Sequence, residues 1–168
     1  MKLNTHLNKI LILGLIVSGL AFQGCSSKKA TTDESDLASP TTAIQEEALG
    51  DSDSGKALGL QTVNFAYDSF ALDSHSKEVL KGNAKVLKDK PSARVQVEGH
   101  CDQRGGIQYN IALGEKRASI VKKYLEDQGI AGDRLSTISY GKERLVDTAM
   151  TESAFAKNRR ANFVITSR

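Results

Sequence analysis

The chain has 168 residues, of which 39% are hydrophobic and 26% charged, as expected for one globular domain with an extension. The formal net charge is +3, and removal of an N-terminal segment containing Lys2 and Lys9 leaves 21 basic against 20 acidic residues. This near balance, with 5% aromatics and no tryptophan, argues against a nucleic-acid-binding protein and against an aromatic stacking platform.

Residues 1–24 are predicted to be a signal peptide of the lipoprotein type. Lysines without any acid precede an apolar run over residues 10–22, which is too short to span a bilayer comfortably. A small residue, Gly24, directly before Cys25 resembles the bacterial lipobox, in which the cysteine becomes the first mature residue and carries the lipid. Phe22 and Gln23 depart from the usual lipobox residues, and ordinary signal cleavage with a free Cys25 is the alternative. In such lipoproteins Ser26, instead of Asp, implies sorting to the outer membrane.

Residues 25–57 are predicted to be a lipidated N-terminus followed by a disordered tether. Ser, Thr, Ala, Gly and acidic residues dominate this stretch, which has hardly any apolar cluster. About thirty residues of flexible chain reach on the order of 30 Å on average and about 100 Å when stretched. With Cys25 lipidated, Cys101 has no partner, so we expect no structural disulfide.

Residues 58–168 are predicted to form one domain. Strands that alternate with amphipathic helices predict an α/β (α+β) two-layer sandwich, in which helices cover one sheet. The predicted order is β-α-β-α-β-(α)-β. The strands are expected at residues 61–66, 93–98, 133–140 and 160–166, and the helices from Asp73 or Ser74 to 88, from Asn110 to 128, and as a short turn at 153–158.

Asp102 and Arg117 are the first candidates for a binding site. Asp102 follows the carboxyl end of a predicted strand, where α/β folds usually place ligands. Arg117 is in line with Leu113, Val121 and Leu125 on one helix face, and a guanidinium in a core-facing stripe is costly unless an anion meets it. The pair suits a zwitterion, with an ammonium at Asp102 and a carboxylate at Arg117. The alternative is a direct Asp102–Arg117 salt bridge that fastens the loop to the helix.

Five blocks of sequence, in order and spacing, resemble the OmpA-like peptidoglycan-binding domain, and most closely that of the peptidoglycan-associated lipoproteins. The resemblance begins near Val63 and continues to the C-terminus, and the lipobox and tether match the same family at the front. Cys101 departs from the pattern, because the family usually has threonine or another small residue there. Ala66 also replaces a residue that is often larger or acidic. The blocks are F-A-Y-D-S, V-E-G-H-C-D-Q-R-G, Y-N-I-A-L-G-E-K-R-A, S-Y-G-K-E and K-N-R-R-A.

The resemblance implies a ligand, the stem peptide of peptidoglycan, held by its diaminopimelate side chain. In that family the aspartate at the position of Asp102 takes the ammonium, and the arginine at the position of Arg117 takes the carboxylate. The other positions that the resemblance assigns to the pocket are Asp68 as a second acidic wall, Asn110 and Leu113 at the helix entrance, and Arg104 and Arg160 at the rim.

The resemblance also implies a location and partners. Such a protein is a lipid-anchored lipoprotein on the periplasmic face of the outer membrane, which it tethers to the cell wall. It is expected to meet TolB and TolA-type Tol proteins in the Tol–Pal system of envelope constriction, and to need no cofactor. The alternative is an OmpA-like lipoprotein that acts mainly as a protein-interaction module, or as a wall binder outside any Tol system.

Catalysis and metal binding are the competing interpretations of the sequence His100-Cys101-Asp102. Neighbouring residues at a strand end point to opposite faces, so His100 cannot readily activate Cys101. Zinc binding by His75, His100 and Cys101 lacks a recognisable ligand spacing. We therefore expect neither an enzyme nor a metal site, and we expect His100 to be a hydrogen-bonded structural residue beneath the loop.

Overall fold

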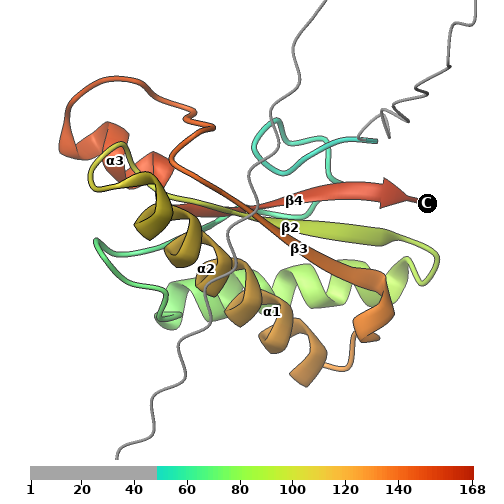
Figure 1. The fold of residues 1–168 in the computed structure, drawn as a ribbon. Coiled ribbons are helices and arrows are strands. Elements are labelled where there is room, and N and C mark those ends of the chain that lie inside the picture. The colour runs from blue at the N-terminus through green and yellow to red at the C-terminus, as the bar shows by residue number, and fades with distance from the viewer. Residues whose placement is uncertain (1–48) are drawn as a thin grey trace, which may run out of the picture. The chain divides into compact units, whose positions relative to one another are not determined.

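The computed structural model describes residues 49–168, which form a four-stranded sheet with helices packed on one face (Figure 1). The α/β sandwich and the predicted order of elements are confirmed. Cys25 and the predicted signal peptide lie outside the described residues. The elements are β1 (Val63–Asn64), α1 (Ser74–Asp89), β2 (Arg94–His100), α2 (Ile107–Asp127), the 3₁₀ turn η1 (Gly132–Arg134), β3 (Leu135–Gly141), α3 (Glu152–Asn158) and β4 (Arg160–Ser167).

The sheet is mixed, with the strand order β1-β4-β2-β3. β2 and β3 are parallel and are joined through α2, whereas β4 runs antiparallel to both β1 and β2. A parallel pair needs a crossover that packs on the sheet, and α2 is that crossover. The loop after β2 and the start of α2 therefore meet at one edge of the sheet.

The helix ends follow from local sequence. The Asp73 carboxylate accepts a hydrogen bond of 2.7 Å from the Ser76 N–H, which caps the start of α1 as one of the two predicted caps. α2 begins at Ile107, three residues before the predicted Asn110, and has no side-chain cap. It ends before Gly129, whose φ of 90° is the left-handed conformation that suits glycine after a helix.

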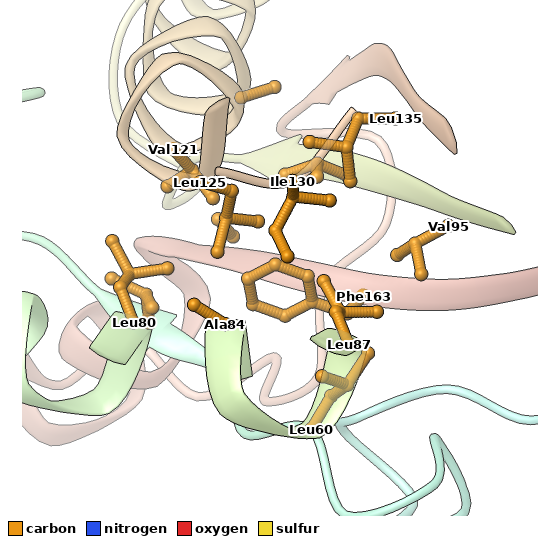
Figure 2. Packing of buried hydrophobic residues seen from close by; sticks show 14 of the residues in the cluster. Leu60, Leu80, Ala84, Leu87, Val95, Val121, Leu125, Ile130, Leu135 and Phe163 are labelled. Carbon is orange, nitrogen blue, oxygen red and sulfur yellow. The ribbon is translucent and has the colours of Figure 1, made fainter. Parts of the chain in front are cut away.

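The core lies between the sheet and the two long helices, around the ring of Phe163 (Figure 2). Ala161, Phe163 and Ile165 alternate along β4 and are all fully buried, as the period of a strand predicts. Leu87 of α1 and Leu125 of α2 belong to the same cluster. No helix in residues 49–168 is long and apolar enough to cross a membrane.

The folded unit begins before Leu58. The Leu49 N–H donates to the Ile165 carbonyl at 3.1 Å, and the Ser52 N–H donates to the Phe163 carbonyl at 2.9 Å. This segment extends the sheet along the part of β4 that the two-residue β1 leaves open, and Ala57 after it is fully buried. Residues 49–57, which the sequence analysis assigned to the tether, therefore belong to the fold.

Candidate functional site

A cavity of about 200 Å³ opens where β2 ends, between the loop after β1, the loop after β2 and the first turns of α2. Six of the seven predicted ligand-binding residues line it, and Arg160 does not. The lining residues are Tyr67, Asp68, Cys101, Asp102, Arg104, Gly105, Tyr109, Asn110, Leu113, Arg117 and Arg159.

Glycines let α2 approach the end of β2. A Cβ on Gly99 would lie 1.9 Å from the Gly114 carbonyl oxygen, and one on Gly114 would lie 2.3 Å from the Ser139 hydroxyl. Side chains at these two positions would push the helix off the sheet. The close approach carries the buried Arg117, one turn further along α2, beneath the loop that contains Asp102.

Arg117 is buried to 1% exposure and holds two chain segments together. Its Nε donates to the Ser69 carbonyl at 2.8 Å, and its Nη2 donates to the Ala66 carbonyl at 3.3 Å, in the loop after β1. Its Nη1 donates to the His100 carbonyl at 2.8 Å, at the end of β2. The guanidinium thus fixes both sides of the cavity through neutral acceptors.

The positive charge of Arg117 has no carboxylate partner in the part of the chain that the structure describes. No ion pair there contains Arg117, so the alternative of a direct salt bridge to Asp102 is not realised. Burial lowers the pKa of Arg117, which reflects the cost of an uncompensated cation. The Cys101 thiol lies 3.4 Å from Nη1 and the Phe65 ring centre 5.1 Å from the guanidinium carbon.

Asp102 is paired with two other arginines. Arg104 binds it through Nη2 at 2.7 Å, Nε at 3.2 Å and its main-chain N–H at 3.1 Å. Arg159 Nη1 lies 3.3 Å from the second carboxylate oxygen. Burial alone would raise the pKa of Asp102, but the hydrogen bonds from Arg104 and Arg159 outweigh burial and keep that pKa below its usual range. Four donors thus occupy the two oxygens of this carboxylate.

Asp68 offers a more open carboxylate on the other wall. It is exposed, and Tyr109, whose side chain also lines the cavity, donates its hydroxyl to it. This hydrogen bond and burial raise the pKa of Tyr109, so the phenol keeps its proton. The φ of Asp68 is 51°, a left-handed conformation that aspartate tolerates in a turn.

Arg159 lines the cavity, whereas Arg160 turns to the opposite side. Arg160 Nε lies 2.7 Å from an Asp53 carboxylate oxygen, in the segment that extends the sheet. Arg159 instead donates to the Phe65 carbonyl at 3.1 Å and reaches Asp102. The placement of Arg160 at the rim is therefore corrected to Arg159. Successive residues at the start of a strand point to opposite faces, and this alternation was the available signal.

His100 and Cys101 do not form a catalytic pair. The His100 ring stacks on Tyr140, with ring centres 5.6 Å apart, and Nε2 lies 3.5 Å from Glu98. Cys101 lies on the cavity side, its thiol 3.4 Å from the Asn110 carbonyl. Burial raises the pKa of Cys101, which disfavours the reactive thiolate. His100 packs as a structural residue, but its ring nitrogens lack the expected hydrogen bonds within residues 49–168. No cluster of side chains that could hold a metal ion is found among the same residues.

Comparisons with known proteins identify the family of the chain. The OmpA family matches residues 64–159, which include every residue that lines the cavity. The chain is 36% identical to the peptidoglycan-associated lipoprotein of Mesorhizobium japonicum over 152 residues, covering 87% of this chain and 86% of that protein. The chain belongs to the OmpA family and, within it, to the peptidoglycan-associated lipoproteins.

Other relatives match a shorter stretch of the chain. The peptidoglycan-associated lipoprotein of Pasteurella multocida is 41% identical over 100 residues, which are 60% of this chain and 67% of that protein. The crystal structure of the peptidoglycan-associated lipoprotein from Burkholderia pseudomallei superposes with a TM-score of 0.60 and 35% identity. That match covers 62% of this chain and 88% of the other. The OmpA-family match ends at Arg159, so Arg160 lies just outside it.

Proposed function

We propose that the cavity binds peptidoglycan through the diaminopimelate side chain of a stem peptide. The observation that carries this proposal is the guanidinium of Arg117, a buried cation beside an open cavity without a carboxylate of its own. A buried charge needs an anionic partner, and a ligand carboxylate supplies one. The names of the relatives point to the same polymer.

In this proposal the ligand ammonium binds at the acidic side of the same cavity. Asp102 is the aspartate that the family resemblance assigns to it, and the exposed Asp68 adds a second carboxylate. Because Arg104 occupies both oxygens of Asp102, its side chain gives up part of that contact when the ammonium arrives. The Arg104 side chain is 34% exposed and rests on the rings of Tyr67 and Phe155, each 4.3 Å away. It can therefore shift without breaking the core.

The whole chain is proposed to tether the outer membrane to the wall without catalysis. Lipidated Cys25 holds the membrane, the segment after it spans the gap, and the domain grips the wall reversibly. A single site of this kind gives modest affinity, and many copies along a polymeric wall make the attachment strong by avidity. TolB and TolA-type proteins are the proposed partners. Tyr67 and Tyr109, exposed by 63% and 56% beside the cavity, give a protein partner the aromatic contacts that interfaces favour.

The test is a pull-down on purified sacculi with the fragment from Ala43 to Arg168, which keeps the whole compact unit. A fragment from Leu58 would lose the main-chain hydrogen bonds that residues 49–52 make with β4. Asp68→Asn and Arg117→Lys are expected to reduce retention at least tenfold in protein that circular dichroism shows to be folded. Full retention by both folded variants would contradict the proposed site, and release by free diaminopimelate is expected from the wild type.

A further inference from the structure

The outer side of the helix layer carries a second concavity, separate from the wall-binding cavity. It has a volume of about 300 Å³ and lies between the loop before α1 and the last turns of α2. Its floor is apolar, formed by Leu72, Ile120 and Tyr124, which pack against the core from outside. Phe70 stands at its side with 44% of its surface exposed. We refer to this concavity as the α1/α2 groove; no residue lines both it and the wall-binding cavity.

A row of exposed lysines runs along α1 and begins at the groove. Lys77 lines the groove directly, and its carbonyl accepts the Tyr124 hydroxyl at 3.3 Å, which joins the two helices. Lys81, Lys85 and Lys88 follow at four, eight and eleven residues, so they lie roughly 40°, 80° and 20° around the helix from Lys77. All four are exposed, and the row is about 16 Å long. One side of α1 therefore carries a row of lysines that begins at the groove with Lys77.

α2 adds two lysines on the other side. Lys116 lies 5.5 Å from the centre of the Phe70 ring, and Lys123 lines the groove. Lys123 is paired with Asp127 at 3.0 Å, and Asp127 is the acidic residue of the lining. Within residues 49–168, no salt bridge contains Lys116 or any lysine of the α1 row. The groove is thus an apolar surface beside several lysines, of which only Lys123 has an ion-pair partner in the described part of the chain.

We propose that the α1/α2 groove docks on a bilayer surface that contains anionic phospholipid. The lysines would contact headgroup phosphates, while Phe70 and the apolar floor meet the upper acyl region. Membrane-surface segments combine these features: an aromatic and aliphatic side that enters the interface, flanked by lysines whose long stems reach the headgroups. Charge complementarity favours this occupant over a neutral apolar peptide.

The kind of cation also favours a lipid surface. The basic side chains that line the groove, contact Phe70 or continue the row along α1 are all lysines, which act as mobile point charges, and none is an arginine with its fixed fork. Headgroup phosphates are mobile and need no fixed geometry, whereas a protein or nucleic-acid partner is more often read by arginine. The proposal does not depend on the wall-binding role, because the two surfaces share no lining residue.

The test measures binding of the unlipidated fragment 43–168 to vesicles by co-sedimentation. Vesicles of phosphatidylglycerol and phosphatidylcholine in equal parts are compared with pure phosphatidylcholine, at 50 mM and 500 mM NaCl. We expect the wild type to bind the anionic vesicles at low salt and to lose at least tenfold in partitioning at high salt or on neutral vesicles.

Two triple variants with the same loss of charge separate the groove from net charge. Lys81, Lys85 and Lys88 changed to Gln are expected to lower partitioning at least tenfold, because each lysine near an anionic surface contributes separately. The matched control changes to Gln three lysines that neither line the groove nor belong to the α1 row, with an expected loss below twofold: Lys56, Lys122 and Lys157.

The apolar part of the surface is tested with Phe70→Ser, for which we expect a loss of about threefold or more on anionic vesicles and retained sacculus binding. Equal losses in the two triple variants would overturn the proposal, as would the absence of vesicle binding by the wild type. Binding of soluble polyglutamate in place of vesicles would also overturn it and would identify an acidic protein as the partner. Circular dichroism checks that each variant is folded.

Discussion

Replacing Arg117 by lysine tests whether the guanidinium holds the walls of the cavity together in addition to supplying a positive charge. Three different nitrogens of Arg117 donate to the carbonyls of Ser69, His100 and Ala66 at 2.8, 2.8 and 3.3 Å. A lysine has its donors on one atom and cannot reach all three carbonyls, so at least one hydrogen bond is lost. Since a hydrogen bond to a charged group contributes about 1.5–3 kcal/mol, Arg117→Lys should lower the free energy of unfolding by at least about 1.5–3 kcal/mol.

Arg134→Lys is the matched control for this change. Arg134 also donates to three main-chain carbonyls, those of Ala93, Leu87 and Lys90, at 3.0, 2.9 and 2.8 Å. It lies at the opposite end of the sheet, on the turn before β3, and does not line the cavity. It should therefore lose stability but not sacculus binding.

Urea unfolding followed by circular dichroism gives the stability of both variants. Binding is measured by pull-down on sacculi without urea, at a temperature at which both variants are folded. We expect both midpoints to fall, and only Arg117→Lys to lose retention on sacculi. The reasoning is refuted if Arg117→Lys unfolds at the wild-type urea concentration. It is also refuted if folded Arg134→Lys loses as much binding as Arg117→Lys.

Three further changes test the fold and the site. Gly99→Ala should destabilise by about 3 kcal/mol, because overpacking forces the backbone at Gly114 to move; a wild-type melting temperature would contradict the close approach. Removing residues 49–57 should lower the free energy of unfolding by about 3 kcal/mol, because the main-chain hydrogen bonds to β4 are lost. An unchanged midpoint in urea unfolding would show that the segment is not part of the fold. Because the pKa of Asp102 is lowered in the folded state, ionised Asp102 stabilises the fold above about pH 4, and this stabilisation is lost as the pH falls through the folded-state pKa. Asp102→Asn should therefore weaken the dependence of stability on pH in this acidic range, measured by urea unfolding.

The sequence predicts the regular elements and the position of the cavity because both depend on short-range patterns. The period of two along β4 and of 3.6 along α2 marks the residues that the structure buries, and Arg117 stands out as a charge within the apolar stripe. The strand-loop-helix order after Val95 then brings Asp102 and Arg117 to one cavity.

Side-chain pairing could not be predicted in the same way. Asp102 and Arg117 line one cavity but bind different partners, because Arg104 reaches Asp102 from the same loop while carbonyls surround Arg117. The extra edge segment also escaped prediction. Its hydrogen bonds to β4 are made mainly by the main chain, so polar residues such as Asp51 and Ser52 carry no hydrophobic signal of a strand.

The position of this edge segment bears on how a tether would carry load. Leu49 bonds to Ile165, near the C-terminal end of β4, whereas the cavity lies at the opposite end of that strand, beside Arg159. In the proposed tether, the membrane therefore pulls at one end of the sheet and the wall at the other. The pull runs along the strands, so the bonds that join residues 49–52 to β4, and β4 to β2, are loaded together instead of one after another. The antiparallel pair of β2 and β4 at the centre of the sheet thus suits the tethering role. Because the folded part begins at Leu49, the load falls on this pair instead of on the short β1.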